Sequence, residues 1–274
     1  MCLFIAYLSQ RHLEYTTVIN YVHSIVSLHH SHNLPGPDLQ HFTIKEVLAG
    51  LKRTKQELPR QKRPITISHL RHIFDSLTEI PQSRRATFWA ACLTAFNSLL
   101  RSANLFPGRS QPGKAIKVRD VRLTTRGLEL TIRVLKTNRF KGEETKIPLL
   151  RLPQPDDLCP VRAIERLLSQ GFPAEQPLFS YREGGKTRYL SAQHFNCDLR
   201  MCLASHSDPS ASFSTHSFRR GGTTFAIDNG VEIDAVKAQG NWRSDCYRRY
   251  VDNKPVLKRA FVSTVSKCIA THTF

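Results

Sequence analysis

A run of basic and proline residues divides this chain of 274 residues. It reads KRTKQELPRQKRP, from Lys52 to Pro64, with six basic side chains, one acid and two prolines. Prolines interrupt regular structure, and clustered charges of one sign resist burial. We therefore expect residues 52–64 to be an interdomain linker between an N-terminal domain, residues 1–51, and a second domain, residues 65–274.

The segment before the linker has helical patterns. In TTVINYVHSIVSLHH the apolar residues recur at helical spacing, for example at Val18, Val22, Ile25 and Val26. The stretches LFIAYLSQ and FTIKEVLAGLKRTK have similar patterns. The loop NLPGPDL separates TTVINYVHSIVSLHH from FTIKEVLAGLKRTK. The N-terminal domain is therefore predicted to be helical. Its first predicted helix begins almost at Met1, as expected for a domain that is truncated or naturally short.

The second domain combines helices with a short β region. FWAACLTAF, from Phe88 to Phe96, predicts a buried helix. KAIKVRDVRLTT and GLELTIRVLKTN alternate apolar and polar residues around a turn at Arg126-Gly127, and ETKIPLLRL adds a third strand. The pattern is helical again from Pro160. We therefore predict a mainly α fold with a small antiparallel β-sheet, of the α+β class.

The net charge points to a polyanionic partner. The chain has 40 Lys and Arg against 22 Asp and Glu, a formal charge of +18. Nucleic acid is the first candidate. A membrane is less favoured, because no stretch approaches the ~20 apolar residues of a spanning helix, and the start MCLFIAYL lacks the basic region of a signal peptide.

The linker is the first candidate for phosphate contacts. A solvated loop and a nuclear import signal remain alternative interpretations of such a run. The candidate DNA-binding residues are Lys52, Arg53, Lys55, Arg60, Lys62, Arg63, Arg248 and Arg249.

The cysteines favour a reducing compartment. There are seven, an odd number at irregular spacing, as expected for free thiols in a cytosolic or nuclear protein. One candidate zinc site is the set His194, Cys197, Cys202 and His206, which falls within thirteen residues. Their spacing is not a standard zinc pattern, and the segment is predicted to be one helix beginning at Ser191. We expect no metal site.

Several residues with catalytic potential lie in the second domain. His216 and Arg219 are three apart on a predicted helix, so they share a face. Tyr247 and Tyr250 have the same spacing among three arginines. Arg101 follows the apolar run AFNSLL, where a buried arginine requires an anion.

These residues, with Lys136 at the end of the strand TIRVLK, resemble the tyrosine recombinase (phage integrase) family. The matching elements are FNSLLRSANL, VLKTNRFKG, THSFRRGG and GNWRSDCYRRY, in that order. The recombinases of eukaryotic Crypton- and DIRS-type mobile elements are the most similar. The resemblance implies a helical, SAM-like core-binding domain, then a catalytic domain. It implies the catalytic residues Arg101, Lys136, His216, Arg219, Trp242 and Tyr250, with Tyr250 as the nucleophile.

Two positions depart from the family pattern. Asn104 stands where many relatives have an acidic residue three after the first arginine. Where many have a histidine after the glycine, Gly240 is followed by Asn241 and Trp242. Counting back nine from Tyr250 selects Asn241, whereas the motif selects Trp242, whose indole N–H can donate to a phosphate. We favour Trp242.

The resemblance also implies an activity and partners. Double-stranded DNA would be cleaved and rejoined through a 3′-phosphotyrosyl link, with no metal or cofactor, in the nucleus of a eukaryotic host after passage through the cytoplasm. A homo-tetramer would assemble on DNA through the segment after Tyr250, which we expect to form an amphipathic helix that docks on a neighbouring protomer. Two alternatives are a catalytically silent DNA-binding descendant and a type IB topoisomerase.

Overall fold

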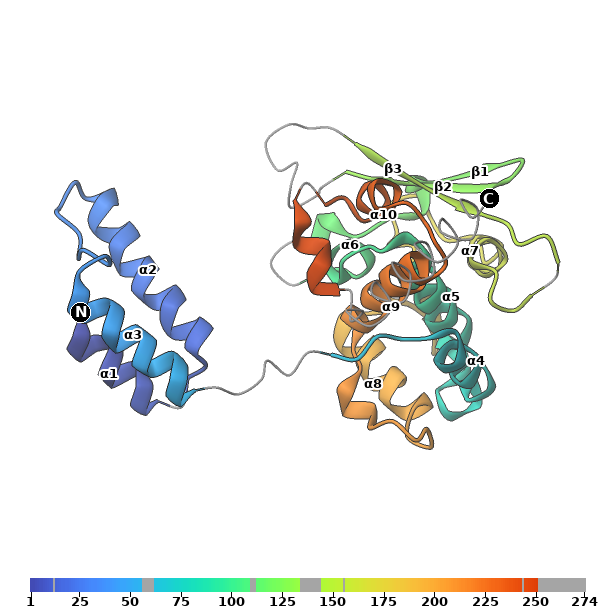
Figure 1. The fold of residues 1–274 in the computed structure, drawn as a ribbon. Coiled ribbons are helices and arrows are strands. Elements are labelled where there is room, and N and C mark those ends of the chain that lie inside the picture. The colour runs from blue at the N-terminus through green and yellow to red at the C-terminus, as the bar shows by residue number, and fades with distance from the viewer. Residues whose placement is uncertain are drawn as a thin grey trace, which may run out of the picture. The chain divides into compact units, whose positions relative to one another are not determined.

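The computed structural model describes residues 1–11, 13–55, 62–108, 112–133, 144–154, 156–242 and 244–250, with the backbone alone at positions 112, 246, 249 and 250. The chain divides into two compact units, Met1–Arg60 and Gln61–Phe274. Both are drawn in Figure 1.

The N-terminal unit contains three helices, α1 (Cys2–Gln10), α2 (Tyr15–Ser31) and α3 (Phe42–Thr54). They enclose a small core in which every helix contributes apolar side chains. The buried members are Ile5, Leu8, Val18, Val22, Ile44 and Leu51. Burial of these side chains stabilises the unit, because isolated helices of this length are marginal in water.

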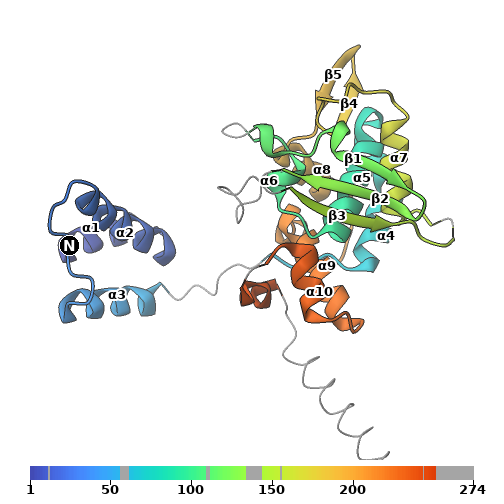
Figure 2. The same cartoon turned by 90° about the horizontal axis from the view of Figure 1, so that it is seen from above.

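The larger unit is arranged around α5 (Gln82–Ser98), which is buried from Thr87 to Phe96. α5 contacts α7, α9 and the strand β4, and it lies in the interior of the unit in both views (Figures 1 and 2). The other helices are α4 (Ile67–Asp75), α6 (Ser102–Leu105), α7 (Pro160–Leu168), α8 (Ala192–Cys202), α9 (Thr215–Asp228) and α10 (Ile233–Gly240). Short 3-10 turns occur at Leu77–Glu79 (η1), Pro112–Lys114 (η2), Val118–Asp120 (η3), Ser210–Ser212 (η4) and Asp245–Tyr250 (η5).

The predicted three-stranded sheet is present. β1 (Val121–Thr124), β2 (Gly127–Ile132) and β3 (Thr145–Leu150) pair antiparallel in the order β1-β2-β3. On β2 the buried residues Leu128, Leu130 and Ile132 alternate along the strand, as expected for a sheet with one face against the core. Together with the helices, this sheet confirms the predicted fold class.

A second, two-stranded sheet was not predicted. β4 (Ser180–Glu183) and β5 (Lys186–Tyr189) form a hairpin, which Figure 2 shows as a separate ribbon. Gly184 and Gly185, with φ of 56° and 73°, form the two-residue turn. Two consecutive positive φ values are the signature of the type I′ turn that matches strand twist, so the Gly-Gly pair was an available signal that our helical assignment after Pro160 missed.

Two adjacent glycines allow α9 to approach its neighbours closely. A Cβ atom on Gly221 would lie 1.9 Å from the backbone oxygen of Ile65, and one on Gly222 would lie 2.1 Å from that of Phe96. Neither distance is compatible with a real side chain. α9 is therefore held between α5 and the chain segment that leads into α4.

The structure differs from the predicted linker at both ends. α3 continues to Thr54, so Lys52 and Arg53 lie in the last turn of a helix. At the other end, the backbone N–H of Arg63 donates to Ser212 at 2.9 Å and that of Ile65 donates to Ser217 at 3.0 Å. Residues 63–65 are therefore attached to the larger unit beside α9, because local backbone hydrogen bonds outweigh the charge of this end of the run.

None of the helices in the described part of the chain is long and apolar enough to span a membrane.

Candidate active site

Arg219 is the most deeply buried charged side chain of the predicted set, with 2% of its surface exposed. It lies on α9. One terminal nitrogen donates to the carbonyl oxygen of Leu99 at the end of α5, and the other donates to Gly240 O at the end of α10, at 2.8 Å. A guanidinium donates in one plane, so these two bonds fix its orientation. Arg219 therefore joins three helices at one point.

Trp242 covers this guanidinium. The Arg219 Cζ atom lies 4.0 Å from the Trp242 ring centroid, in a cation–π arrangement. The indole is 5% exposed, and a Cβ on Gly240 would lie 1.9 Å from it. Gly240 therefore provides the space in which the indole stacks. The predicted contact between Trp242 and phosphate stays a prediction, and Asn241, with φ 53°, takes the left-handed C-cap position.

Arg101 follows α5 closely and is half-buried. Leu99 adopts φ 53°, which ends α5, and Arg101 then occupies the N-cap position of α6. Its carbonyl oxygen accepts from the backbone N–H of Asn104 at 2.9 Å. Asn104 is buried, and its own carbonyl accepts from Ile116 N. Backbone hydrogen bonds at Asn104 thus hold the loop that presents Arg101.

His216 lies one turn before Arg219 on α9, at a position with substantial solvent exposure. Partial burial of the imidazole, followed by the positive charges of Arg219, Arg220 and Arg101, lowers the pKa of His216 below its ordinary value of 6.5. The structure therefore brings three of the predicted residues, Arg101, His216 and Arg219, into one electrostatic environment. The neutral imidazole favoured there can accept a proton.

Arg220 is a residue of this environment that the sequence analysis did not select. It is 5% exposed, and its Nη1 donates to the carbonyl oxygen of Lys62 at 3.2 Å. Both consecutive arginines that follow His216 lie within one helical turn of it, but the three-residue spacing of the His216–Arg219 pair selected only Arg219. Arg220 joins the site to the chain that enters the larger unit.

The two candidate tyrosines lie in η5, a 3-10 helix that packs against α9. Tyr247 is 8% exposed and lies in one apolar cluster with Trp242, Leu99 and Val236. Tyr247 therefore packs beside Trp242 in this cluster. Tyr250 is the last residue of η5, and its side chain lies outside the described part of the structure.

Asp245 anchors η5 to its surroundings. Its carboxylate lies 3.8 Å from the Lys237 ammonium of α10 and 3.1 Å from Arg248. A hydrogen bond with the Tyr247 side chain, and then the charge of Asp245, raises the pKa of the exposed Arg248. Arg248 is thus a fixed cation at the surface beside the candidate nucleophile.

The remaining predicted phosphate contacts have varied surroundings. Lys52 and Arg53 are exposed on α3, and Lys55 is half-buried at its end. The Lys62 ammonium donates to Ala211 O at 2.6 Å, and Arg63 pairs with Asp208. Lys136, Arg60, the side chain of Arg249 and the segment after Tyr250 lie outside the described residues.

The His and Cys set weighed as a zinc site does not converge. α8 begins after its N-cap Ser191, as predicted. His194 and Cys197 are exposed on it, whereas Cys202 is buried with its thiol against Ser76 O. Burial raises the pKa of Cys202 to about 12, so it is a protonated core residue.

The fold of this chain was compared with those of known proteins. No family model and no curated protein sequence matches the chain. Among solved structures, the Tn1549 transposon integrase in complex with transposon right end DNA has a TM-score of 0.66 at 12% identity, over 97% of this chain and 84% of that one. XerA recombinase gives 0.51 at 12% identity, over 96% and 83%. XerH site-specific recombinase bound to a difH substrate gives 0.52 at 11% identity, over 91% and 72%.

The chain therefore has the tyrosine recombinase fold. At these identities the likeness establishes the architecture, and the chemistry of the site rests on the residues described above.

Proposed function

We propose that this protein cleaves and rejoins DNA strands as a metal-independent tyrosine recombinase of a mobile element, similar to those of the Crypton and DIRS type. The observation that supports this most directly is that Arg101 and Arg219 lie near His216, whose pKa is lowered and which lies on α9, the helix that packs against η5. The net charge of +18 suits a DNA substrate.

The proposed reaction is a phosphodiester exchange. The Tyr250 oxygen forms a bond to the scissile phosphorus, and the bond from phosphorus to the 5′ oxygen breaks. His216 takes the tyrosine proton, and Lys136 protonates the leaving 5′ oxygen. Arg101 and Arg219 donate to the non-bridging oxygens, where negative charge increases in the transition state.

Arg219 is nearly inaccessible in this structure, so DNA binding has to change its surroundings. Its donors are shared with Leu99 and Gly240, and Trp242 covers its face. We propose that a bound phosphate displaces part of this arrangement, and that Trp242 then directs its indole N–H at the phosphate.

The phosphotyrosyl bond conserves the energy of the broken bond, so religation needs no cofactor. Exchange between two duplexes requires four such sites. We therefore propose a homo-tetramer on DNA, assembled through the segment after Tyr250, acting in the nucleus of a eukaryotic host.

Covalent trapping on nicked DNA tests the chemistry. The probe is a pool of nicked duplexes of randomised sequence, from which protein–DNA adducts are recovered under denaturing conditions. The wild-type chain should form an adduct, and Tyr250→Phe should abolish it while duplex binding persists. Tyr247→Phe, the matched control, should only reduce the yield, because this side chain packs in the core.

Mapping the DNA-linked peptide by mass spectrometry identifies the nucleophile. A link at Tyr247 would overturn the assignment of Tyr250. Binding without any adduct would favour a silent DNA-binding protein, and relaxation of supercoiled plasmid without a target sequence would favour a topoisomerase.

A further inference from the structure

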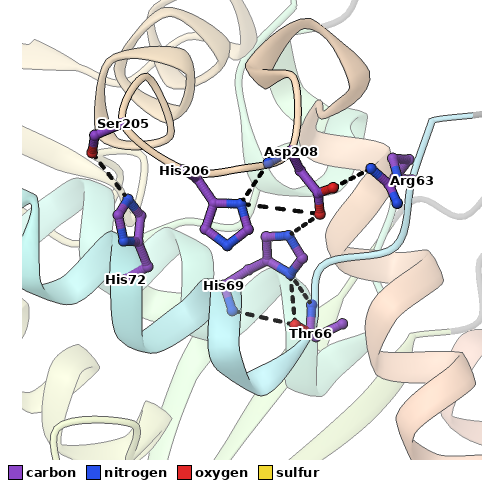
Figure 3. Close-up of polar contacts among 7 residues, drawn as sticks. All are labelled: Arg63, Thr66, His69, His72, Ser205, His206 and Asp208. Atoms are coloured by element: carbon purple, nitrogen blue, oxygen red, sulfur yellow. Dashed lines mark hydrogen bonds and ion pairs between the residues drawn. The ribbon is translucent and has the colours of Figure 1, made fainter.

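Three potential metal ligands converge outside the proposed active site. His69 lies on α4, whereas His206 and Asp208 lie in the segment between α8 and η4. One donor atom from each lies within 4.8 Å of the other two. In Figure 3 the two imidazoles and the carboxylate face one another. No pattern in the sequence groups His69 with Asp208, which lies 139 positions further along the chain.

The distances are close to those of a coordination shell. Asp208 Oδ2 lies 3.1 Å from His69 Nε2 and 4.0 Å from His206 Nδ1. In a tetrahedral zinc site with bonds of about 2.0–2.1 Å, neighbouring ligand atoms lie about 3.3–3.4 Å apart. The two observed distances lie on either side of that value, and the donor atoms of the two imidazoles lie within 4.8 Å of each other. Completing the shell therefore requires the histidine donors to move closer together.

Two further residues, Thr66 and Arg63, contact the sides of these ligands that face away from the proposed site. Thr66 Oγ1 lies 2.6 Å from His69 Nδ1, the ring nitrogen that faces away from Asp208. Arg63 pairs with Asp208 Oδ1, which leaves Oδ2 for the histidines. Metal-bound histidines and carboxylates in proteins have such outer partners, which fix their orientation.

Metal binding would exchange a limited set of contacts. The hydrogen bond between His69 and Asp208 Oδ2 would be replaced, as would the bonds from Asp208 N–H to His206 Nδ1 at 3.1 Å and from Thr66 N–H to His69 Nδ1 at 3.2 Å. His69 would then carry its proton on Nδ1 and donate it to Thr66 Oγ1, which lies 2.6 Å away. The side chains of His69, His206 and Asp208 are 9%, 16% and 25% exposed, so a water molecule can reach the fourth position.

We propose that His69, His206 and Asp208 bind a divalent transition metal ion, with Zn²⁺ as the best match. Two imidazoles with one carboxylate suit zinc and its neighbours, whereas magnesium and calcium prefer oxygen ligands throughout. The role we assign to the ion is structural. It would tie α4 to the loop before α9, beside the hydrogen bonds that attach residues 63–65, and it takes no part in strand cleavage.

Titration of the full chain with Co²⁺ after removal of bound metal tests the proposal. Cobalt in such a site gives visible d–d absorption, and histidine with carboxylate ligands give no thiolate-to-cobalt band in the near ultraviolet. We expect saturation at one Co²⁺ per chain, and displacement by Zn²⁺. His206→Gln should weaken binding by at least about tenfold.

The matched control is His72→Gln, because His72 also lies on α4 and contacts Ser205 at 3.3 Å, but is outside the donor set. It should bind Co²⁺ like the wild type. If His206→Gln does not fold, Asp208→Asn, which preserves side-chain shape, takes its place. Equal binding by the ligand variant and the wild type, equal loss in the control, or a thiolate band that places the ion at the cysteines would each overturn the proposal.

A thermal measurement adds a second readout. Zn²⁺ at about a hundredfold excess over its dissociation constant should raise the melting temperature of the wild type and of His72→Gln by roughly 5 °C. The ligand variant should show no such shift. A shift of the same size in the ligand variant would contradict the assignment.

Discussion

At the scale of single residues, the pKa of His216 depends on the positive charges around it. Burial and then Arg219, Arg220 and Arg101 lower its pKa, so its protonated form is disfavoured in the folded protein. The unfolded chain takes up this proton at a higher pH than the folded chain. The free energy of unfolding therefore falls as the pH drops through about 6.5, and this effect is absent well above that pH.

The first prediction concerns this titration. NMR of the imidazole in the free protein should give a pKa below 6.5, and Arg101→Ala should move it upward, because one nearby positive charge is removed. Inorganic phosphate bound at the site should also raise it. Lys117→Ala, on a residue paired with Glu175 at 2.7 Å, is the control and should leave the titration unchanged. A wild-type value at or above 6.5 would contradict the described arrangement.

The second prediction separates chemistry from binding. Arg101→Ala should reduce adduct formation on the nicked duplex pool by orders of magnitude, because in the proposed reaction Arg101 donates to the scissile phosphate. Duplex affinity should change little, since many other basic residues would remain to contact the backbone. Parallel gel-shift and trapping assays provide the comparison. Equal loss in both assays would assign Arg101 a structural role instead.

At the scale of secondary-structure elements, a buried ion pair links α5 to α8. Arg84 Nε and Nη2 each donate to Asp198 at 2.8 Å, and the Asp198 side chain is fully buried. The hydrogen bond with Asp198 raises the pKa of Arg84. Removal of one partner leaves the other charge desolvated without compensation.

The third prediction follows from this pair. Asp198→Ala should lower the free energy of unfolding by about 3–5 kcal/mol, and the double variant Arg84→Met, Asp198→Ala should lower it by less. Urea denaturation of the larger unit measures both. A loss in the double variant as large as that of Asp198→Ala would show that the unpaired Arg84 charge is not the cause.

The fourth prediction uses two glycines in helices. Gly221→Ala should destabilise the larger unit by on the order of 3 kcal/mol or more, because the new Cβ meets the backbone of Ile65. Gly50 of α3 has open space around the same position. Gly50→Ala should therefore stabilise the N-terminal unit by about 0.8–1 kcal/mol through helix propensity. Calorimetry of both variants checks the contrast, and destabilisation by Gly50→Ala would be evidence against it.

Hydrophobic periodicity predicted the main helices and strands well, because an element that buries one face has apolar residues at regular intervals in the sequence. The core helix around Phe88–Phe96 and the strand with Leu128, Leu130 and Ile132 illustrate this. Contacts between distant segments were less accessible. The grouping of His69 with Asp208, and the attachment of Arg63 and Ile65 to the start of α9, depend on the tertiary fold. The sequence predicted Trp242 only as a phosphate contact. No sequence pattern shows that its indole stacks on Arg219.

At the scale of the whole molecule, the charge of +18 would govern the proposed binding to DNA. Counterion release makes the affinity of such a surface fall with salt, by about 0.9 log units per log unit for each phosphate contacted. Ion pairs within the protein reduce the number of cations available for this purpose. Lys117 with Glu175 and Arg63 with Asp208 are examples.

The fifth prediction concerns this salt dependence. The wild-type slope should be steep, and replacement of the exposed Lys52 and Arg53 by Gln should reduce it by about 2, if both contact phosphates. Lys117→Gln, on a cation already paired, should leave it nearly unchanged. Filter binding to a random duplex over a range of salt concentrations gives the slopes. A flat dependence for the wild type would exclude phosphate-dominated binding.

The glycine pair of α9 also constrains how such a gene can decay. Every missense change at Gly221 or Gly222 introduces a Cβ where the backbone of Ile65 or Phe96 already lies. Arg101 is half-buried, so a smaller side chain there would meet no such clash. A related copy that is kept only for DNA binding would therefore lose Arg101 before either glycine. The order in which the positions erode across related gene copies would record whether selection has maintained recombination or only a folded binding surface.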